Sequence, residues 1–223
     1  MKKQIKILTL IGAVVVIATI IGASYYRKSI QSERRPFASN DGPLVRPDSP
    51  TLGPANAPVT LVEFLDPECE TCRTFNPFIK QMLKDYDGKL RLVVRYMPLH
   101  PNSRLAAAYT EAAGEQGKYW EMQEVMFRRQ PEWGERHGQP SSTPQEPPAV
   151  LFDRYAAEIG LDVEQLRNSV AQNKFASKID RDQKDGQSLG VARTPTFFVN
   201  GRQLMRFSKE NLKALIDEEL KNE

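Results

Sequence analysis

The amino-acid sequence predicts an α/β fold that carries an inserted α-helical domain and follows one N-terminal transmembrane helix. Three observations support this fold class. A short apolar run, an amphipathic run and a second apolar run succeed one another over residues 59–97, which is the pattern of a β-α-β unit. Residues 99–188 are rich in helix-forming side chains with amphipathic spacing. Residues 7–26 carry no charge and are almost all apolar.

The composition is typical of one domain with an insertion. The chain has 223 residues, of which 40% are hydrophobic and 26% charged. These proportions exclude a mostly disordered chain and a protein with several membrane spans. The net charge of +3 arises in residues 1–35, which hold seven basic side chains and one acid. The basic excess is therefore confined to the N-terminus and does not indicate nucleic-acid binding.

Residues 7–26 predict a membrane anchor. A helix of this length spans about 30 Å, the thickness of the hydrocarbon core of a bilayer. Residues 1–6 would form a basic cytoplasmic stub, and Tyr25–Lys28 an interfacial girdle. The alternative is a cleaved signal peptide with Gly22-Ala23-Ser24 as its cleavage site. The apolar run is long for a signal peptide, so an anchor is favoured. In either case we expect the body of the protein outside the cytoplasm.

The first folded elements are expected after a Pro-rich, aperiodic tether at residues 27–55. Val59–Leu65 is typical of a central strand that is buried on both faces. A helix over Cys69–Tyr86, ended by Asp87-Gly88, and a second strand over Leu90–Met97 follow. This order implies a parallel strand pair with a right-handed crossover.

The remaining residues divide between two domains. Residues 56–98 and 189–223 are expected to form the α/β domain. Residues 99–188 are expected to form the inserted helical domain, with an exposed Pro-rich loop from Pro131 to Pro148. The further predicted elements are helices over 103–130 and 149–188, a strand over Thr196–Val199, a turn at Asn200-Gly201, a strand over Gln203–Phe207, and a helix over Lys209–Leu220 capped by Ser208.

Both cysteines of the chain lie in one motif, Cys69-Glu70-Thr71-Cys72. Two cysteines placed at random would have this spacing in about 1% of sequences of this length, so the motif indicates a redox pair. Cys69 is expected at the N-terminus of a helix, where backbone N–H groups and the helix dipole stabilise a thiolate. Cys72, one turn later, is placed to attack a mixed disulfide at Cys69. No diffusible cofactor is implied, because the electrons reside in the two sulfur atoms.

Other interpretations of the two cysteines stay open. A zinc site would need further ligands, and only His100 and His137 could join the thiols, although both are more typical of loop residues. A soft ion such as Cu(I) could be held by the two thiolates, but the six methionines form no cluster. The pair could also form an inert structural disulfide, or belong to a peptide-binding module without redox activity.

The sequence resembles the DsbA-like branch of the thioredoxin superfamily over roughly residues 51–223. The resemblance implies a thioredoxin-like fold whose inserted helical domain lies between Cys72 and Pro195. It is specific, because separated motifs occur in the right order with the right gaps. These motifs are Ala57–Phe64 followed by Asp66–Cys72, Pro98–Pro101 with the alanine-rich helix after it, and Gly190–Gly201.

The resemblance also implies roles for particular residues. Cys69 and Cys72 would form the redox-active disulfide. Thr194-Pro195 matches the cis-proline loop of the family, which lies against the active-site cysteines and pairs its backbone with an extended substrate. Glu70 and Thr71, between the cysteines, are expected to contact the same substrate.

Glu63 interrupts an otherwise apolar strand six residues before Cys69. Family members carry a buried acid at this place beneath the disulfide. A carboxyl group in such a site should have a raised pKa and could move a proton to or from Cys72. The alternative for Glu63 is a solvated glutamate on an edge strand.

The sequence departs from the family between the cysteines. DsbA-type oxidants have Pro-His there, whereas this chain has Glu70-Thr71, and Asp66 and Glu68 add negative charge nearby. Like charges disfavour a thiolate, so the pKa of Cys69 should lie above that of a strong oxidant. A less stabilised thiolate means a more stable disulfide, so we expect a weaker oxidant or a reductant.

These observations predict a protein thiol:disulfide oxidoreductase at the bacterial cell membrane, with its catalytic domain in the periplasm or otherwise outside the cytoplasm. The expected partners are cysteine-containing substrate proteins and a membrane redox partner, either a DsbB-like oxidase or a DsbD-like reductase. We expect a monomer without a metal ion or nucleic acid. An isomerase is disfavoured, because no separate dimerisation domain fits in the tether.

Overall fold

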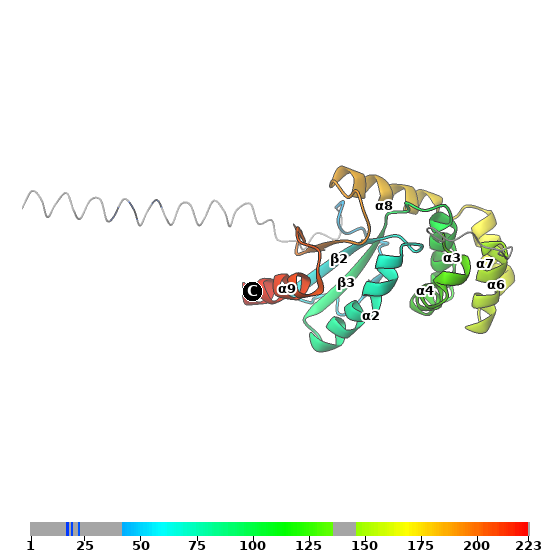
Figure 1. Cartoon of the computed structure of the whole chain (residues 1–223), viewed down its shortest axis with the longest axis horizontal. Helices are drawn as coiled ribbons and strands as arrows, with labels where there is room; N and C mark the ends of the chain where they lie inside the picture. Colours follow the sequence, from blue (N-terminus) through cyan, green and yellow to red (C-terminus); the bar gives the residue numbers. More distant parts are fainter. Residues whose placement is uncertain (1–16, 18, 20–21, 23–41, 136–145, 223) are drawn as a thin grey trace, which may run out of the picture. The chain divides into compact units, whose positions relative to one another are not determined.

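The computed structural model of the chain describes residues 17, 19, 22, 42–135 and 146–222 (Figure 1). The chain divides into two compact units, Met1–Ser39 and Asn40–Glu223. In the first unit, residues 17, 19 and 22 are helical. No helix in the described ranges is both long and apolar enough to cross a membrane. The anchor predicted for residues 7–26 otherwise lies outside the described residues and stays a prediction.

The second unit is built on a sheet of five described strands in the order β1-β3-β2-β4-β5. β2 and β3 are parallel, in register from Val59 opposite Leu90 to Leu65 opposite Tyr96. Every residue of these two strands is buried, because β2 is central and both sheet faces are covered. The predicted β-α-β unit is therefore confirmed. The strands are β1 (Thr51–Leu52), β2 (Val59–Leu65), β3 (Leu90–Tyr96), β4 (Thr196–Val199) and β5 (Arg202–Gln203).

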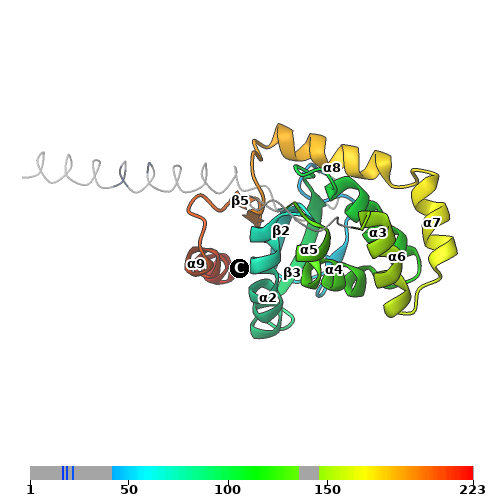
Figure 2. The same cartoon turned by 45° about the vertical axis from the view of Figure 1, so that its right-hand side comes forward.

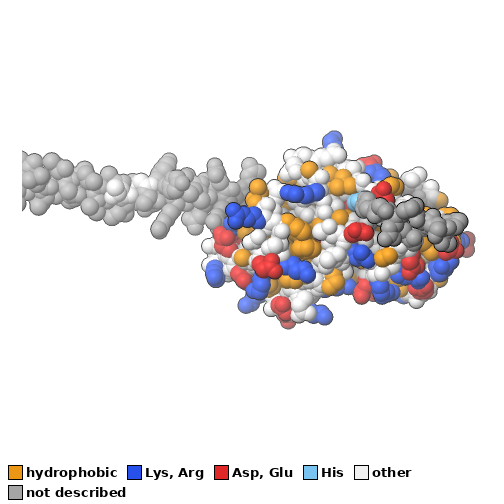
Figure 3. Space-filling view, viewed as in Figure 1, with side chains coloured by type: hydrophobic (Ala, Val, Ile, Leu, Met, Phe, Trp, Pro, Cys, Tyr) orange, Lys and Arg blue, Asp and Glu red, His pale blue; other side chains and the backbone are white. Residues whose placement is uncertain are grey.

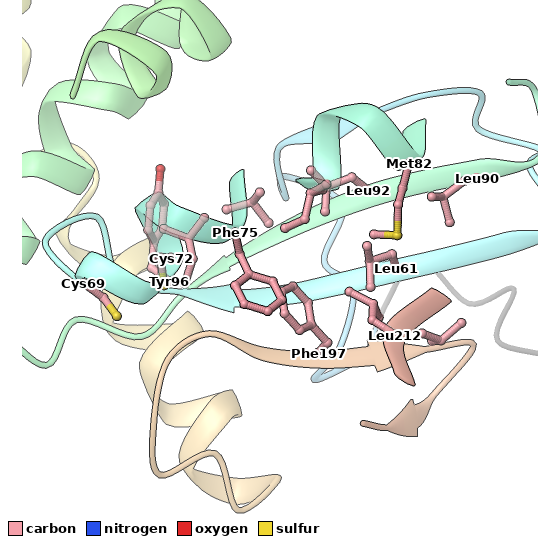
Figure 4. Packing of buried hydrophobic residues seen from close by; sticks show 14 of the residues in the cluster. Leu61, Cys69, Cys72, Phe75, Met82, Leu90, Leu92, Tyr96, Phe197 and Leu212 are labelled. Atoms are coloured by element: carbon pink, nitrogen blue, oxygen red, sulfur yellow. The ribbon is translucent and has the colours of Figure 1, made fainter. Parts of the chain in front are cut away.

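Helices cover both faces of this sheet. Figure 1 shows α8 (Ala176–Ser188) on one side and α2 (Glu70–Asp85) and α9 (Lys209–Lys221) on the other. α2 presents Cys72, Phe75, Ile79 and Met82 to the core, at the three- and four-residue spacing of one helical face. Figure 4 shows how these side chains meet those of the strands and of α9.

α8 approaches the sheet closely, because a glycine faces it. A Cβ atom at Gly186 would lie 3.0 Å from the ring of Phe64 and 3.1 Å from the sulfur of Met97. The sequence predicts α8 as part of the inserted helical domain, and the structure shows that this helix also packs against β3.

The other described helices form a layer at one end of the sheet (Figure 2). Their apolar side chains make a second core, in which Tyr109, Met122, Phe152 and Leu166 are buried. The long helical stretches that the sequence predicts are thus broken into shorter helices. These are α3 (Ser103–Glu115), α4 (Tyr119–Arg128), α5 (Gln130–Trp133), α6 (Pro148–Glu158) and α7 (Val163–Ala171).

The prediction of an exposed loop from Pro131 to Pro148 is wrong for its first residues, which belong to α5. Trp133 is only 1% exposed. Its indole N–H donates to the carbonyl of Met126 at 3.1 Å, and its ring meets Phe152 edge-on at 4.9 Å. The partner ring lies across an intervening segment of the sequence, so no local pattern signals the burial. Residues 136–145 lie outside the described residues.

The prediction of a flexible tether over residues 27–55 is wrong for residues 42–55, which belong to the folded unit. Val45 is 4% exposed. The Arg46 guanidinium donates to both carboxylate oxygens of Asp185 on α8, each at 2.9 Å, and Asp48 pairs with Arg181 at 2.5 Å. These contacts fix a segment that has no periodicity of its own. Residues 27–41 lie outside the described residues.

Charges of both signs cover the surface of this unit. On the face that Figure 3 shows, Lys and Arg side chains alternate with Asp and Glu over the described residues. Many form exposed pairs, such as Lys80 with Glu124 at 2.7 Å. Pairs of this kind contribute at most about 1 kcal/mol each, so the stability of the fold resides in its two apolar cores.

Candidate active site

The two cysteines lie at the start of α2, where β2 has ended. Cys69 is the N-cap residue of the helix, and its own N–H donates to the carbonyl of Asp66 at 3.1 Å. Cys69 is 8% exposed and Cys72 fully buried, whereas Glu70 and Thr71 between them are exposed. Figure 4 shows the pair at one end of the packed core. The structure thus leaves Cys69 with a small exposed fraction and Cys72 with none, at the beginning of the same helix.

The pKa of Cys69 is lowered to about 5. The thiol of Cys72 is the largest cause, since it donates a hydrogen bond to the Cys69 sulfur. The side chain of Thr194 and the backbone N–H groups of Thr71 and Cys72 add to the effect, and partial burial opposes it. This is how a helix N-terminus activates a thiol. The expectation that the protein is a weaker oxidant than DsbA-type proteins stays a prediction.

Cys72 and Glu63 both keep their protons at neutral pH. Burial raises the pKa of the Cys72 thiol well above its ordinary value, and negative charge on Cys69 and Glu63 raises it further. Burial, followed by the charge of Cys69, raises the pKa of Glu63 to about 8. Glu63 is 5% exposed and lies on the central strand, opposite Val94 on one side and Phe197 on the other. The alternative of a solvated edge-strand glutamate is therefore wrong.

The buried carboxyl group of Glu63 should make the fold less stable as the pH rises. An unfolded chain loses this proton near pH 4.5, whereas the folded chain keeps it to about pH 8. Between these values the folded state binds more protons, so the free energy of unfolding falls with rising pH. From pH 4.5 to 7 the expected loss is about 3 kcal/mol. In urea denaturation this loss should appear as the difference between the pH profiles of the unchanged protein and Glu63→Gln, because the lowered pKa of Cys69 acts in the opposite direction in both proteins.

The matched control for this prediction is Glu121→Gln, which removes an exposed glutamate from α4. Its pH profile should follow that of the unchanged protein. If Glu63→Gln and Glu121→Gln have the same pH profile, Glu63 does not titrate in the folded state as described.

The loop before β4 reaches the cysteines from across the sheet. The peptide bond between Thr194 and Pro195 is cis, as the family resemblance implies. Pro195 is buried and Thr194 partly exposed. The sulfur of Cys69 lies 3.3 Å from the carbonyl oxygen of Thr194, and the Cys69 thiol donates to this oxygen when it is protonated. The predicted site residues of the two motifs thus come together, although 125 positions separate Cys69 from Thr194.

The acids near Cys69 are held in hydrogen bonds, which the sequence did not reveal. Asp66 is fully buried and accepts from the backbone N–H groups of Glu68 at 2.8 Å and Leu99 at 2.7 Å. Glu68 is 3% exposed and accepts from the N–H groups of Asn102 at 2.6 Å and Glu135 at 2.9 Å. Their negative charge is therefore compensated by donors, and it does not prevent the low pKa of Cys69.

Sequence reasoning missed Asp66 and His100 as parts of one site. The Nδ1 atom of His100 lies 2.7 Å from Oδ2 of Asp66. One signal could have found the pair. Asp66 follows β2 and His100 follows β3, and the carboxyl ends of adjacent parallel strands lie at the same edge of a sheet. Within the part of the chain that the structure describes, no three His, Cys, Asp or Glu side chains group as a metal site would need.

The helical layer also holds the turn that carries Cys69. The side-chain amide of Gln130, which is 2% exposed, donates to the carbonyl of Pro67 at 2.9 Å and to that of Cys69 at 3.2 Å. Because α5 supplies this side chain, the inserted layer fixes the position of the helix N-terminus that activates the thiol.

Comparison with known proteins agrees with this geometry. Residues 46–218 match the family model described as thioredoxin. The chain is 30% identical over 181 residues to disulfide bond formation protein D of Bacillus subtilis, covering 77% of each protein. The crystal structure of oxidised BdbD from Bacillus subtilis aligns with a TM-score of 0.66 at 28% identity, covering 78% of this chain and 93% of that one.

The chain also resembles part of longer proteins. It is 38% identical over 154 residues to Na(+)/H(+) antiporter NhaA 3 of Salinispora tropica, covering 68% of this chain but 21% of that protein. Two further relatives with the antiporter name are matched over 23% and 29% of their length. The similarity is therefore confined to roughly a quarter of those proteins.

Proposed function

Because the chain belongs to the DsbA-like thiol:disulfide oxidoreductases of the thioredoxin superfamily, we propose that it exchanges disulfide bonds with cysteine-containing proteins outside the cytoplasm. The observation that carries the proposal is the difference between its two cysteines. The pKa of Cys69 is about 5, whereas that of buried Cys72 lies well above its ordinary value. At neutral pH, Cys69 is therefore the thiolate and Cys72 the thiol that carries a proton.

In the oxidising direction, a substrate thiolate attacks the Cys69 sulfur of the Cys69–Cys72 disulfide. The bond between the two cysteines breaks, the Cys72 sulfur leaves with the electron pair and takes up a proton, and a mixed disulfide forms at Cys69. A second substrate thiolate then attacks the substrate sulfur of this mixed disulfide, and Cys69 leaves as a thiolate. Two electrons pass from the substrate to the enzyme. In the reducing direction the same steps run in reverse.

Glu63 would supply the proton that Cys72 needs. With a pKa of about 8, its carboxyl group is mostly protonated at neutral pH, and it can give its proton to the departing sulfur or accept one from it. Thr194 and Pro195, which lie against Cys69, would pair with the backbone of the substrate. Glu70 and Thr71 are exposed beside the reactive sulfur and would contact the same substrate.

The setting of the reaction follows from the predicted N-terminal helix. Residues 7–26 would anchor the chain in the bacterial cell membrane with the catalytic unit outside the cytoplasm. Each catalytic cycle leaves the cysteines in the opposite redox state, so a second protein must restore them. A membrane protein, either a DsbB-like oxidase or a DsbD-like reductase, is the partner we propose for that step.

The proposal is tested by titrating the reactive thiol and by assaying disulfide exchange. The rate of alkylation by iodoacetamide should be half-maximal at about pH 5, because the Cys69 thiolate is the reacting species. In its disulfide form, the protein should oxidise reduced ribonuclease, and the double variant Cys69→Ser, Cys72→Ser should not. Alkylation with an ordinary thiol pKa of about 8.5, together with no oxidation of ribonuclease, would overturn the proposal.

A further inference from the structure

A single carboxylate joins the turn that carries Cys69 to the loop that follows β3. On the first side, the Asp66 carboxylate accepts from the N–H of Glu68 at 2.8 Å. On the other side it accepts from the N–H of Leu99 at 2.7 Å, from the N–H of His100 at 3.2 Å and from the Ser103 hydroxyl. Asp66 is fully buried. The loop that carries His100 is therefore fixed against the redox site.

The imidazole of His100 is oriented by the same carboxylate. Its Nδ1 lies 2.7 Å from Oδ2 of Asp66. Because an ionised carboxylate only accepts, Nδ1 carries a hydrogen and donates it. The proton that the ring gains and loses with pH is therefore the one on Nε2. The side chain is 23% exposed, so this proton can exchange with solvent.

The charged groups that act on His100 come from the turn before α2. Partial burial of the ring opposes its protonation, but the hydrogen bond and charge of Asp66 and the negative charges of Cys69 and Glu68 raise its pKa above the ordinary value. On the α8 side, neutral Gln183 donates to the carbonyl of Pro98 at 3.2 Å. On the α3 side, Arg104 is paired with Asp180. The Cys69 thiolate is thus among the negative charges that favour the imidazolium.

We propose that His100, held by Asp66, is a positioning residue whose positive charge stabilises the reduced form of the Cys69–Cys72 pair and adds to the pH dependence of its reduction potential. The inference rests on the proposed disulfide exchange and names a regulation of that same site. His100 would take the part of the histidine that DsbA-type oxidants carry between their cysteines, from a different loop of the fold.

The proton balance of the reduction follows from this coupling. Reduction of the disulfide takes up two electrons and one proton, which goes to Cys72, while Cys69 stays a thiolate. The new negative charge then draws a further fraction of a proton onto His100, because interaction between two titrating groups is reciprocal. The imidazolium lowers the free energy of the thiolate state below the pKa of His100, and this stabilisation is lost as the pH rises through that value.

The test compares the equilibrium with glutathione over a pH series from about 5 to 9. Between the pKa of Cys69 and that of His100, where the thiolate and the imidazolium coexist, His100→Gln should shift the equilibrium about tenfold toward the disulfide, which corresponds to a potential about 30 mV lower. The difference from the unchanged protein should vanish above the pKa of His100. Lys84→Gln is the control, since it removes an exposed positive charge from the last turn of α2, at the end of the helix opposite to Cys69. A tenfold shift that is constant over the series would assign His100 a structural role and overturn the proposal, as would no shift.

A second measurement is made on the unchanged protein, and His100→Gln serves only to assign the signal. The Cε1–H signal of His100, identified by its loss in His100→Gln, is titrated by NMR in the dithiol and disulfide forms. Its pKa should be higher in the dithiol form, because the Cys69 thiolate is present only there. Equal pKa values in both forms would overturn the coupling. Protein substrates are not needed for this measurement, so failure of the proposed function with ribonuclease remains distinguishable from failure of this inference.

Discussion

Replacing Cys72 with serine is expected to abolish turnover and to trap substrates on Cys69. The Cys69 thiolate still attacks a substrate disulfide and forms the mixed disulfide, because a serine hydroxyl at position 72 can donate the hydrogen bond that the Cys72 thiol gave and the backbone N–H groups remain. The buried sulfur that would resolve this intermediate is gone, so the rate of complete exchange should fall by at least about 10³-fold. Non-reducing electrophoresis after incubation with oxidised insulin should show a covalent adduct that a reducing agent releases.

The matched variant is Cys69→Ser, which should form no adduct. Cys72 is fully buried, and its pKa lies well above the ordinary value. It therefore cannot replace Cys69 as the attacking thiolate at neutral pH. Equal adduct formation by the two variants would contradict the distinction between an attacking and a resolving cysteine.

Replacing Arg95 with methionine is expected to destabilise the fold by about 3–5 kcal/mol. Arg95 is fully buried in β3, and its guanidinium lies 2.8 Å from Asp182 and 2.6 Å from Asp185, both on α8. It also donates to the carbonyl of Pro43 at 2.7 Å. Without it, fully buried Asp182 keeps only a 3.6 Å contact with Arg181 as an ion pair. The midpoint of urea denaturation reports the change.

Two further variants separate charge from packing in this prediction. The double variant Arg95→Met, Asp182→Leu should recover much of the stability, because it removes the buried charge together with its partner. Arg104→Met breaks an exposed pair with Asp180, whose side chains are 46% and 61% exposed. Its effect should stay below about 1 kcal/mol. A loss for Arg95→Met no larger than that for Arg104→Met would refute the uncompensated buried charge of Asp182 as the cause of the destabilisation.

Much of the fold could be predicted from local patterns. The apolar runs Val59–Leu65 and Leu90–Tyr96 predict parallel strands that are buried on both faces. The structure shows both strands, with every residue buried. The helix between them begins at the cysteine motif, as its spacing predicts. The pairing of Thr194-Pro195 with Cys69 was available only through the family resemblance, since the contact joins residues far apart in the sequence.

The segments that were mispredicted are held by long-range partners. Val45 and Arg46 lie in a stretch without periodicity, and a partner on α8 fixes them. The sequence predicts that the negative charge of Asp66 opposes a thiolate at Cys69. It does not reveal the donors that compensate this charge, because they include a loop more than 30 positions away. Composition and residue spacing predict local secondary structure. They carry little information on which distant group compensates a buried charge.

The two outermost strands of the sheet have a consequence for an enzyme that would handle unfolded chains. β1 and β5 close the sheet in the part of the chain described, and each is only two residues long. An extended polypeptide that added itself alongside either one would find few free backbone partners. A partly unfolded chain would therefore have little opportunity to add itself to the sheet of this protein as a further strand.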